Sequence, residues 1–144
     1  MLSIRVIAAM LVFSFLAFNC EDAGSGPGGS ATPAGAYRYQ SFDSTGIPLV
    51  KGWFTLVFSD PDHCTGEWHF AAIGSRQKIG PQVGDGNLVG GTTDGSVWVE
   101  LQPQFRDNNL ELVGTIQDGR YRGRWIWISF VGETNSGFFD AKRQ

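Results

Sequence analysis

From residue 36 to the C-terminus, apolar and polar residues alternate with a period of two, and no stretch carries the 3.6-residue apolar stripe of an amphipathic helix. Aromatic and β-branched residues are frequent there. Turn signals such as DSTG, SDPDH, TDG and QDG recur at short intervals. This combination predicts an all-β domain built from short antiparallel strands.

We expect eight strands, over residues 37–41, 49–59, 64–73, 88–92, 96–102, 110–117, 120–131 and 137–143. Tight turns join most of them, and an up-and-down meander of eight strands closes into a small barrel that has no exposed edge. The predicted fold is an eight-stranded antiparallel up-and-down β-barrel, and a two-sheet β-sandwich is the alternative.

One hairpin can be placed in register from the sequence. Asp118–Gly119 is a strong type I′ turn signal, and it pairs Gln117 with Arg120. One face of the hairpin then pairs Ile116 with Tyr121, Leu112 with Trp125 and Leu110 with Trp127, whereas the other pairs Thr115 with Arg122 and Val113 with Arg124. Because both strands agree on which face is apolar, the register is well specified.

The same alternation predicts a crowded barrel interior. Eight aromatic rings are expected inside, from Phe54, Phe58, Trp68, Phe70, Tyr121, Trp125, Trp127 and Phe139. An eight-stranded barrel is only wide enough for side chains or one small ligand, so we expect a solid interior. Several apolar residues are expected outside, namely Trp53, Val57, Trp98, Ile126, Ile128, Phe130 and Phe138, and a contiguous patch of them would mark an interaction site.

The N-terminal part predicts export. Residues 1–19 combine a basic start with an apolar run too short to span a bilayer comfortably, as in a signal peptide. Residues 20–35 form a tether rich in Gly, Ser and Pro, and residues 36–144 form the β domain. Cys20 lies directly after the apolar run, and two processing routes remain open: lipidation of Cys20, which we favour, and ordinary cleavage before Gly26.

Two resemblances accompany these patterns. Residues 66–68 (GEW) and 123–125 (GRW) match the short G-x-W motif of lipocalins and related calycin barrels, although the lipocalin motif lies on the first strand. The placement of Cys20 resembles a bacterial lipoprotein, and residues 106–125 with 136–143 look like short secreted bacterial domains of no assigned activity. These resemblances imply a barrel anchored by lipid in the bacterial cell envelope, at the outer membrane, or else a secreted or periplasmic one.

Candidate binding residues come from the predicted outer face. Arg120, Arg122 and Arg124 form a stripe that could bind an anion, or a solvated edge balanced by Glu111 and Asp118. Together with Trp53 and Trp98, the three arginines make up the predicted binding surface.

Catalysis, metals and cofactors find little support in the sequence. Asp60, Asp62, His63 and Cys64 crowd one turn that could ligate a metal, but Asp-Pro-Asp is also an ordinary turn, and no metal or cofactor is predicted. No catalytic motif stands out, so we expect no enzyme. Cys64 is expected to be a shielded free thiol. The net charge of −3 argues against nucleic acid as a partner.

These observations favour a non-enzymatic binding module. Its expected partners are the membrane, through the N-terminal lipid anchor, and a small molecule, glycan or protein. The alternative is a structural or inhibitory envelope lipoprotein that acts through its outer aromatic surface. Both are inferences from fold and location.

Overall fold

The computed structural model describes residues 33–75, 77 and 79–144. The predicted signal peptide, Cys20 and nearly all of the tether lie outside these residues. Eight strands follow one another: β1 (Gly35–Phe42), β2 (Pro48–Asp60), β3 (His63–Ala72), β4 (Gly84–Thr93), β5 (Ser96–Glu100), β6 (Asn108–Gln117), β7 (Arg120–Ser129) and β8 (Gly132–Arg143). A short 3-10 helix, η2 (Gly80–Gln82), precedes β4. All eight predicted strands are therefore present.

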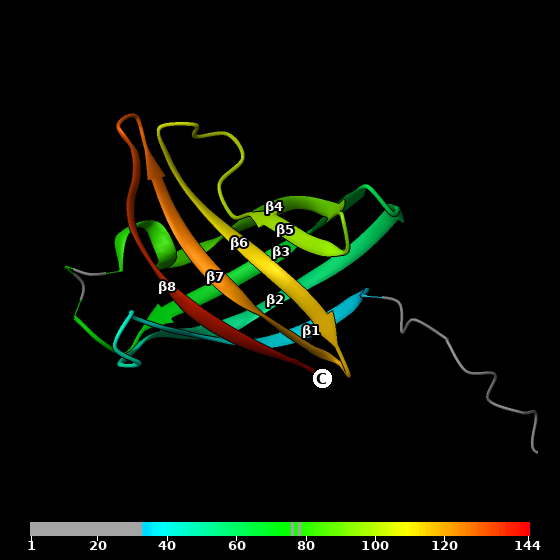
Figure 1. Cartoon of the computed structure of the whole chain (residues 1–144), viewed down its shortest axis with the longest axis horizontal. Coiled ribbons are helices and arrows are strands. Elements are labelled where there is room, and N and C mark those ends of the chain that lie inside the picture. Colours follow the sequence, from blue (N-terminus) through cyan, green and yellow to red (C-terminus); the bar gives the residue numbers. More distant parts are fainter. Residues whose placement is uncertain (1–32, 76, 78) are drawn as a thin grey trace, which may run out of the picture.

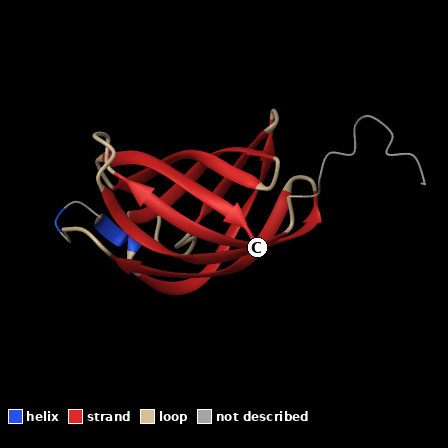
Figure 2. Cartoon of the chain, turned by 90° about the horizontal axis from the view of Figure 1, so that it is seen from below, coloured by secondary structure: helices blue, strands red, loops and turns tan. Residues whose placement is uncertain are grey.

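The strands form a closed barrel in which each pairs antiparallel with the next and β8 pairs with β1 (Figures 1 and 2). The predicted up-and-down barrel is confirmed, and the sandwich alternative is wrong. Closure satisfies the backbone hydrogen bonds of the first and last strands, which would otherwise be edges open to aggregation.

The β6–β7 hairpin has the predicted register from Gln117↔Arg120 to Leu110↔Trp127. Asp118 and Gly119 both have positive φ, as a type I′ turn requires. Asp94 and Gly95 repeat this conformation between β4 and β5. The Asp-Gly turns thus fix two of the seven connections.

Two strand boundaries differ from the sequence prediction by more than two residues. β4 begins at Gly84 rather than Leu88, because its first residues pair with the end of β3 and Gly86 lies opposite Trp68. β8 begins at Gly132 rather than Gly137, after a turn at residues 130–131, and a bulge at Trp127/Ile128 adjusts the register. In both places polar or glycine-rich residues resembled a loop although their backbones pair.

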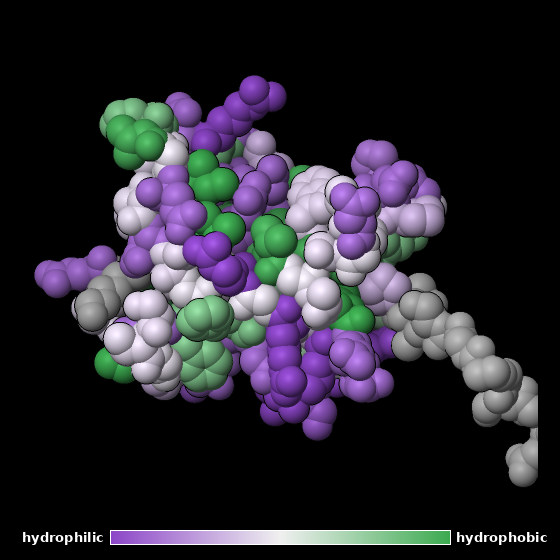
Figure 3. Space-filling model, in the orientation of Figure 1, coloured by the Kyte–Doolittle hydropathy of each residue, from purple (hydrophilic) through white to green (hydrophobic). Residues whose placement is uncertain are grey.

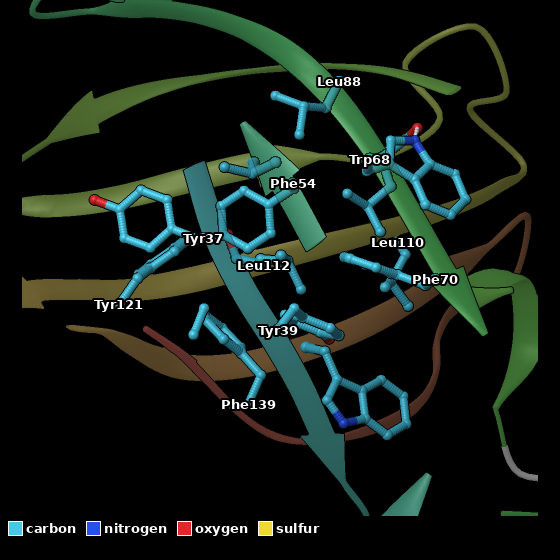
Figure 4. Close-up of a cluster of buried hydrophobic side chains, with 14 of the residues drawn as sticks. Tyr37, Tyr39, Phe54, Trp68, Phe70, Leu88, Leu110, Leu112, Tyr121 and Phe139 are labelled. Carbon is cyan, nitrogen blue, oxygen red and sulfur yellow. Dashed lines mark hydrogen bonds between the residues drawn. The ribbon is translucent and has the colours of Figure 1, made fainter. Parts of the chain in front are cut away.

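The interior is filled by rings (Figure 4). Six of the eight rings predicted to point inward are buried, whereas Phe58 and Trp127 are half-buried against the core. Tyr37 and Tyr39 of β1 are buried as well. The Tyr39 ring stacks on Phe70 with centroids 4.1 Å apart, because Gly52, which lies between them in the sheet, has no side chain there.

The two ends of the barrel are built differently. Turns at 61–62, 94–95 and 118–119 make a compact turn end, where β1 enters and the chain finishes (Figure 1). The turn at 43–47, the described residues of segment 73–83, loop 101–107 and the turn at 130–131 make the opposite loop end.

Both tryptophans of the G-x-W motifs lie toward the loop end. Trp68 Nε1 donates to the Leu101 carbonyl at 2.8 Å, and Trp125 Nε1 donates to the Phe42 carbonyl at 2.8 Å. Segment 73–83 contributes two further buried residues, Ile79 and Gln82, and its Gly80 packs against the ring of Trp127. These groups close the loop end of the interior.

Candidate functional site

A groove of about 610 Å³ lies on the outer wall of the barrel, over β8, β1, β2 and β3. We call it the basic groove. Its characteristic side chains are Arg38, Gln40, Lys51, Trp53, His69, Arg120, Asp140, Lys142 and Gln144. Four Lys or Arg residues and a single Asp line it, although the chain as a whole is acidic.

The register of five strands sets the geometry of the groove. Arg120 of β7 pairs with Lys142 of β8, which pairs with Arg38 of β1. Arg38 pairs with Trp53 of β2, which pairs with His69 of β3. Since directly paired residues share a face, these five side chains form one row that crosses the closure between β8 and β1. Hydrophilic residues gather where β8 ends in the space-filling view (Figure 3).

Trp53 and His69 form the aromatic part of the row. Their ring centroids lie 6.3 Å apart, and their planes are inclined by 23°, so the rings stack side by side on the wall. Trp53 is 40% exposed, which is unusual for so large an apolar ring on a barrel wall. The pair offers a flat surface to a ligand.

The cations of the groove differ in their partners. Arg120 forms a two-bond ion pair with Asp140, and the pKa of its guanidinium is raised by that hydrogen bond. Arg122 Nε also lies 3.6 Å from Asp140 Oδ1. Arg38, Lys51 and Lys142 form no ion pair with any described acid. Three exposed cations beside Trp53 are therefore available to an anionic ligand.

The structure brings together only part of the predicted binding surface. Trp53 and Arg120 both line the basic groove, and Arg122 lies beside it. Arg124 lies further along β7, where its guanidinium contacts Glu133 at 3.1 Å and Ser136 at 2.9 Å. Trp98 is half-buried on β5, paired between Gly91 and Val113, and two strands, β3 and β4, separate it from Trp53 on β2. The arginine stripe forms its ion pairs with Asp140 and Glu133 of β8 rather than with the predicted Glu111 and Asp118.

The other groove residues were missed from the sequence. Arg38, Lys51 and Lys142 lie far apart along the chain and share no motif. The pairing of β1 with β8 is what places Lys142 beside Arg38. A sequence-based search could have found them by continuing the alternation on β1 and assuming that the barrel closes.

The Asp60–His63 turn has the structure of an ordinary turn. His63 Nδ1 lies 3.0 Å from Asp60 Oδ1, and Asp60 Oδ1 also accepts the Asp62 backbone N–H at 2.9 Å. The hydrogen bond from His63 is the main cause that lowers the pKa of Asp60. In the described ranges, no group of three His, Cys, Asp or Glu side chains is arranged to hold a metal.

Cys64 is shielded, as expected. Its side chain is buried, and it has no disulfide partner among the described residues. Burial raises the pKa of the thiol to about 11, so the reactive thiolate is scarce at neutral pH.

The loop end carries a second surface feature. Six of the nine exposed large apolar residues in the described part of the chain lie there: Ile47, Ile73, Val83, Phe105, Phe130 and Val131. Figure 3 shows hydrophobic atoms at the tip where β7 turns into β8. The remaining three, Trp53, Val57 and Phe138, lie on the outer wall.

A comparison with protein families found no match for this chain, and neither did comparisons with curated proteins and with solved structures. Over the residues that the structure describes, no helix has both the length and the apolar character needed to span a bilayer.

Proposed function

We propose that this protein is a non-enzymatic binding module that takes its ligand on the outer wall of the barrel, in the basic groove. The observation that carries the proposal is the half-exposed Trp53 next to three cations without acid partners. Exposed aromatic and cationic groups in one concavity supply stacking and charge-assisted hydrogen bonds to the same molecule.

The filled interior supports a binding site outside the barrel. Barrels that carry a ligand inside leave the space for it, whereas this interior holds rings in mutual contact, such as Tyr39, Phe54 and Phe70. Interiors packed in this way do not open for a ligand without a large loss of contacts.

The test compares two exposed aromatic residues of the outer wall. A panel of neutral saccharides, acidic saccharides and fatty acids is screened by thermal shift on the wild type, on Trp53→Ala and on Phe138→Ala. Phe138 is also exposed on the wall but lies outside the basic groove. We expect a stabilising saccharide whose effect is lost in Trp53→Ala and kept in Phe138→Ala. A ligand that stabilises both variants equally, or strong protection by a fatty acid, would overturn the proposal.

We also propose that the module is exported and held in the bacterial cell envelope by a lipid on Cys20. The sequence pattern supports this, and so does the entry of the chain at the turn end, where Gly35 begins β1. A tether attached there would direct the loop end away from the membrane. Intact mass and detergent fractionation of the full gene product test this: Cys20→Ala should release the protein, and a soluble product that begins at Gly26 would refute it.

A second candidate function is supported by the apolar loop end. Phe130 and Val131 are 83% and 74% exposed at the tip of the β7–β8 hairpin, and Phe105 is 58% exposed. Exposed apolar side chains at one end of a rigid barrel favour contact with a protein partner, as in a structural or inhibitory envelope lipoprotein. Cross-linking from position 130 in intact cells tests it, and the absence of any partner-specific adduct would count against it.

A further inference from the structure

We infer that the basic groove binds an acidic oligosaccharide, lying across the strands along the row from His69 to Arg120. The inference rests on the proposed function and adds the chemical class of the ligand and its direction on the barrel.

The stacked pair of Trp53 and His69 indicates a ligand with a ring. The apolar face of a sugar ring carries C–H groups that pack flat against an indole, and the exposed Trp53 ring, which lines the basic groove, offers such a face. A peptide in an extended conformation would instead pair with a strand edge, and this barrel is closed.

The cations indicate negative charge at intervals along the ligand. Neighbouring strands lie about 4.8 Å apart, so Arg38 follows Trp53 by one such step, Lys142 by two and Arg120 by three. The whole row from His69 to Arg120 spans about 19 Å along the curved wall. An oligosaccharide with recurring carboxylates would place one ring on Trp53 and its charges over Arg38 and Lys142.

A second row of paired residues beside the first supplies polar groups and limits where an anion is attracted. Lys51 pairs with Gln40, and Gln40 pairs with Asp140. The Gln40 amide can both donate to and accept from sugar hydroxyls. Asp140 neutralises Arg120 and repels anions, so the strongest attraction lies on the Trp53 side of Asp140.

A single-stranded nucleic acid is the competing ligand, because it too combines rings with negative charges. Grooves of that kind stack successive bases on successive aromatic side chains within a strongly basic surface. Among the residues that line the groove, the only stacked ring pair is Trp53 with His69, and the chain carries a net charge of −3. These features favour the saccharide.

The experiment uses the mature full chain in detergent, titrated by calorimetry and by NMR. Four probes are compared: tetragalacturonate, a neutral tetrasaccharide of glucose, sodium phosphate and a short single-stranded DNA. We expect tetragalacturonate to bind best and to weaken as salt is raised, because the exposed charges are screened.

Variants locate the ligand on the row. Trp53→Ala should weaken tetragalacturonate binding about tenfold through loss of stacking. Arg38→Gln and Lys142→Gln should each weaken it about three- to tenfold through loss of an exposed charge-assisted hydrogen bond. Phe138→Ala and Arg124→Gln are the matched controls, since both residues lie on the same wall outside the groove, and they should bind as the wild type does.

The outcomes separate the two proposals. If the neutral tetrasaccharide or the DNA binds more tightly than tetragalacturonate and Trp53→Ala abolishes that binding, the groove is a binding site but the acidic saccharide is wrong. If tetragalacturonate binds and only the control variants weaken that binding, the assignment of the binding site to the basic groove is wrong. Absence of tetragalacturonate binding at millimolar concentration overturns the inference.

Discussion

Replacement of Trp125 should reveal how far the barrel depends on its loop-end ring. Trp125 is fully buried, and its indole N–H donates to the Phe42 carbonyl of the neighbouring wall at 2.8 Å. Trp125→Ala removes the ring, opens a cavity and leaves that carbonyl without its donor. Large-to-small changes of this kind cost about 3–5 kcal/mol, and loss of the hydrogen bond to the half-buried Phe42 adds about 0.5–1.5 kcal/mol.

This loss is a large part of the stability of a small domain, which is about 5–15 kcal/mol in total. Trp125→Phe is therefore the second variant, because it keeps most of the ring and removes the N–H. Trp98→Ala is the control, since Trp98 is only half-buried on the outer wall. Urea melts followed by circular dichroism give the free energies of unfolding. We expect the free energy of unfolding to fall several-fold more in Trp125→Ala than in Trp98→Ala, with Trp125→Phe in between.

Equal destabilisation by Trp125→Ala and Trp98→Ala would refute the reasoning. It would mean that the outer wall at β5 carries as much packing energy as the interior. A midpoint that changes together with the slope of the melt would instead show a change in compactness of one of the two states.

Three further predictions concern the interior. Cys64 should react slowly with a thiol reagent in the native protein and rapidly in denaturant, because it is buried and its pKa is raised to about 11; immediate native labelling would contradict this. Gly52→Ala should destabilise by about 2 kcal/mol or more in urea melts, since a Cβ there would lie 2.0 Å from the His69 carbonyl oxygen and 2.8 Å from the Phe70 ring. Burial raises the pKa values of Tyr37, Tyr39 and Tyr121, so the folded state holds these protons more tightly than the unfolded chain does. The free energy of unfolding should therefore be unchanged below about pH 9 and should fall as the pH rises beyond about 10. A melting temperature that stays constant over that range would refute the argument.

The sequence predicted the fold because its signals were local and mutually consistent. The Asp118–Gly119 turn and the alternation on both flanking strands specified one hairpin in register, as the pairing of Ile116 with Tyr121 confirms. The glycine-rich start of β4 was misread, because its pairing depends on Trp68 of another strand and not on its own residues. Tyr37 and Tyr39 were overlooked as core residues although they alternate on one short strand.

The candidate site was only partly predictable, because it combines residues that no local pattern connects. Trp53 stood out as an aromatic residue on an outward position, and Arg120 stood out in a stripe. Arg38 and Lys142 became neighbours only through closure of the barrel, at a sequence separation of almost the whole domain. Contacts across the closure can be predicted only from the strand pairing. No turn joins the first strand to the last, so no local sequence signal predicts that they pair.

The interior and the groove are linked through the same strands. On β1, Tyr37 and Tyr39 point inward and fill the barrel, while Arg38 between them points outward into the groove. On β2, Phe54 is buried, and the neighbouring Trp53 is exposed. Because the side-chain period of a strand is two, a slip of one residue at the β1–β2 pairing would expose the rings and bury the cations. The rings that close the interior therefore hold Arg38 and Trp53 in place on the outer wall, and the register that excludes a ligand from the barrel is the one that assembles the groove.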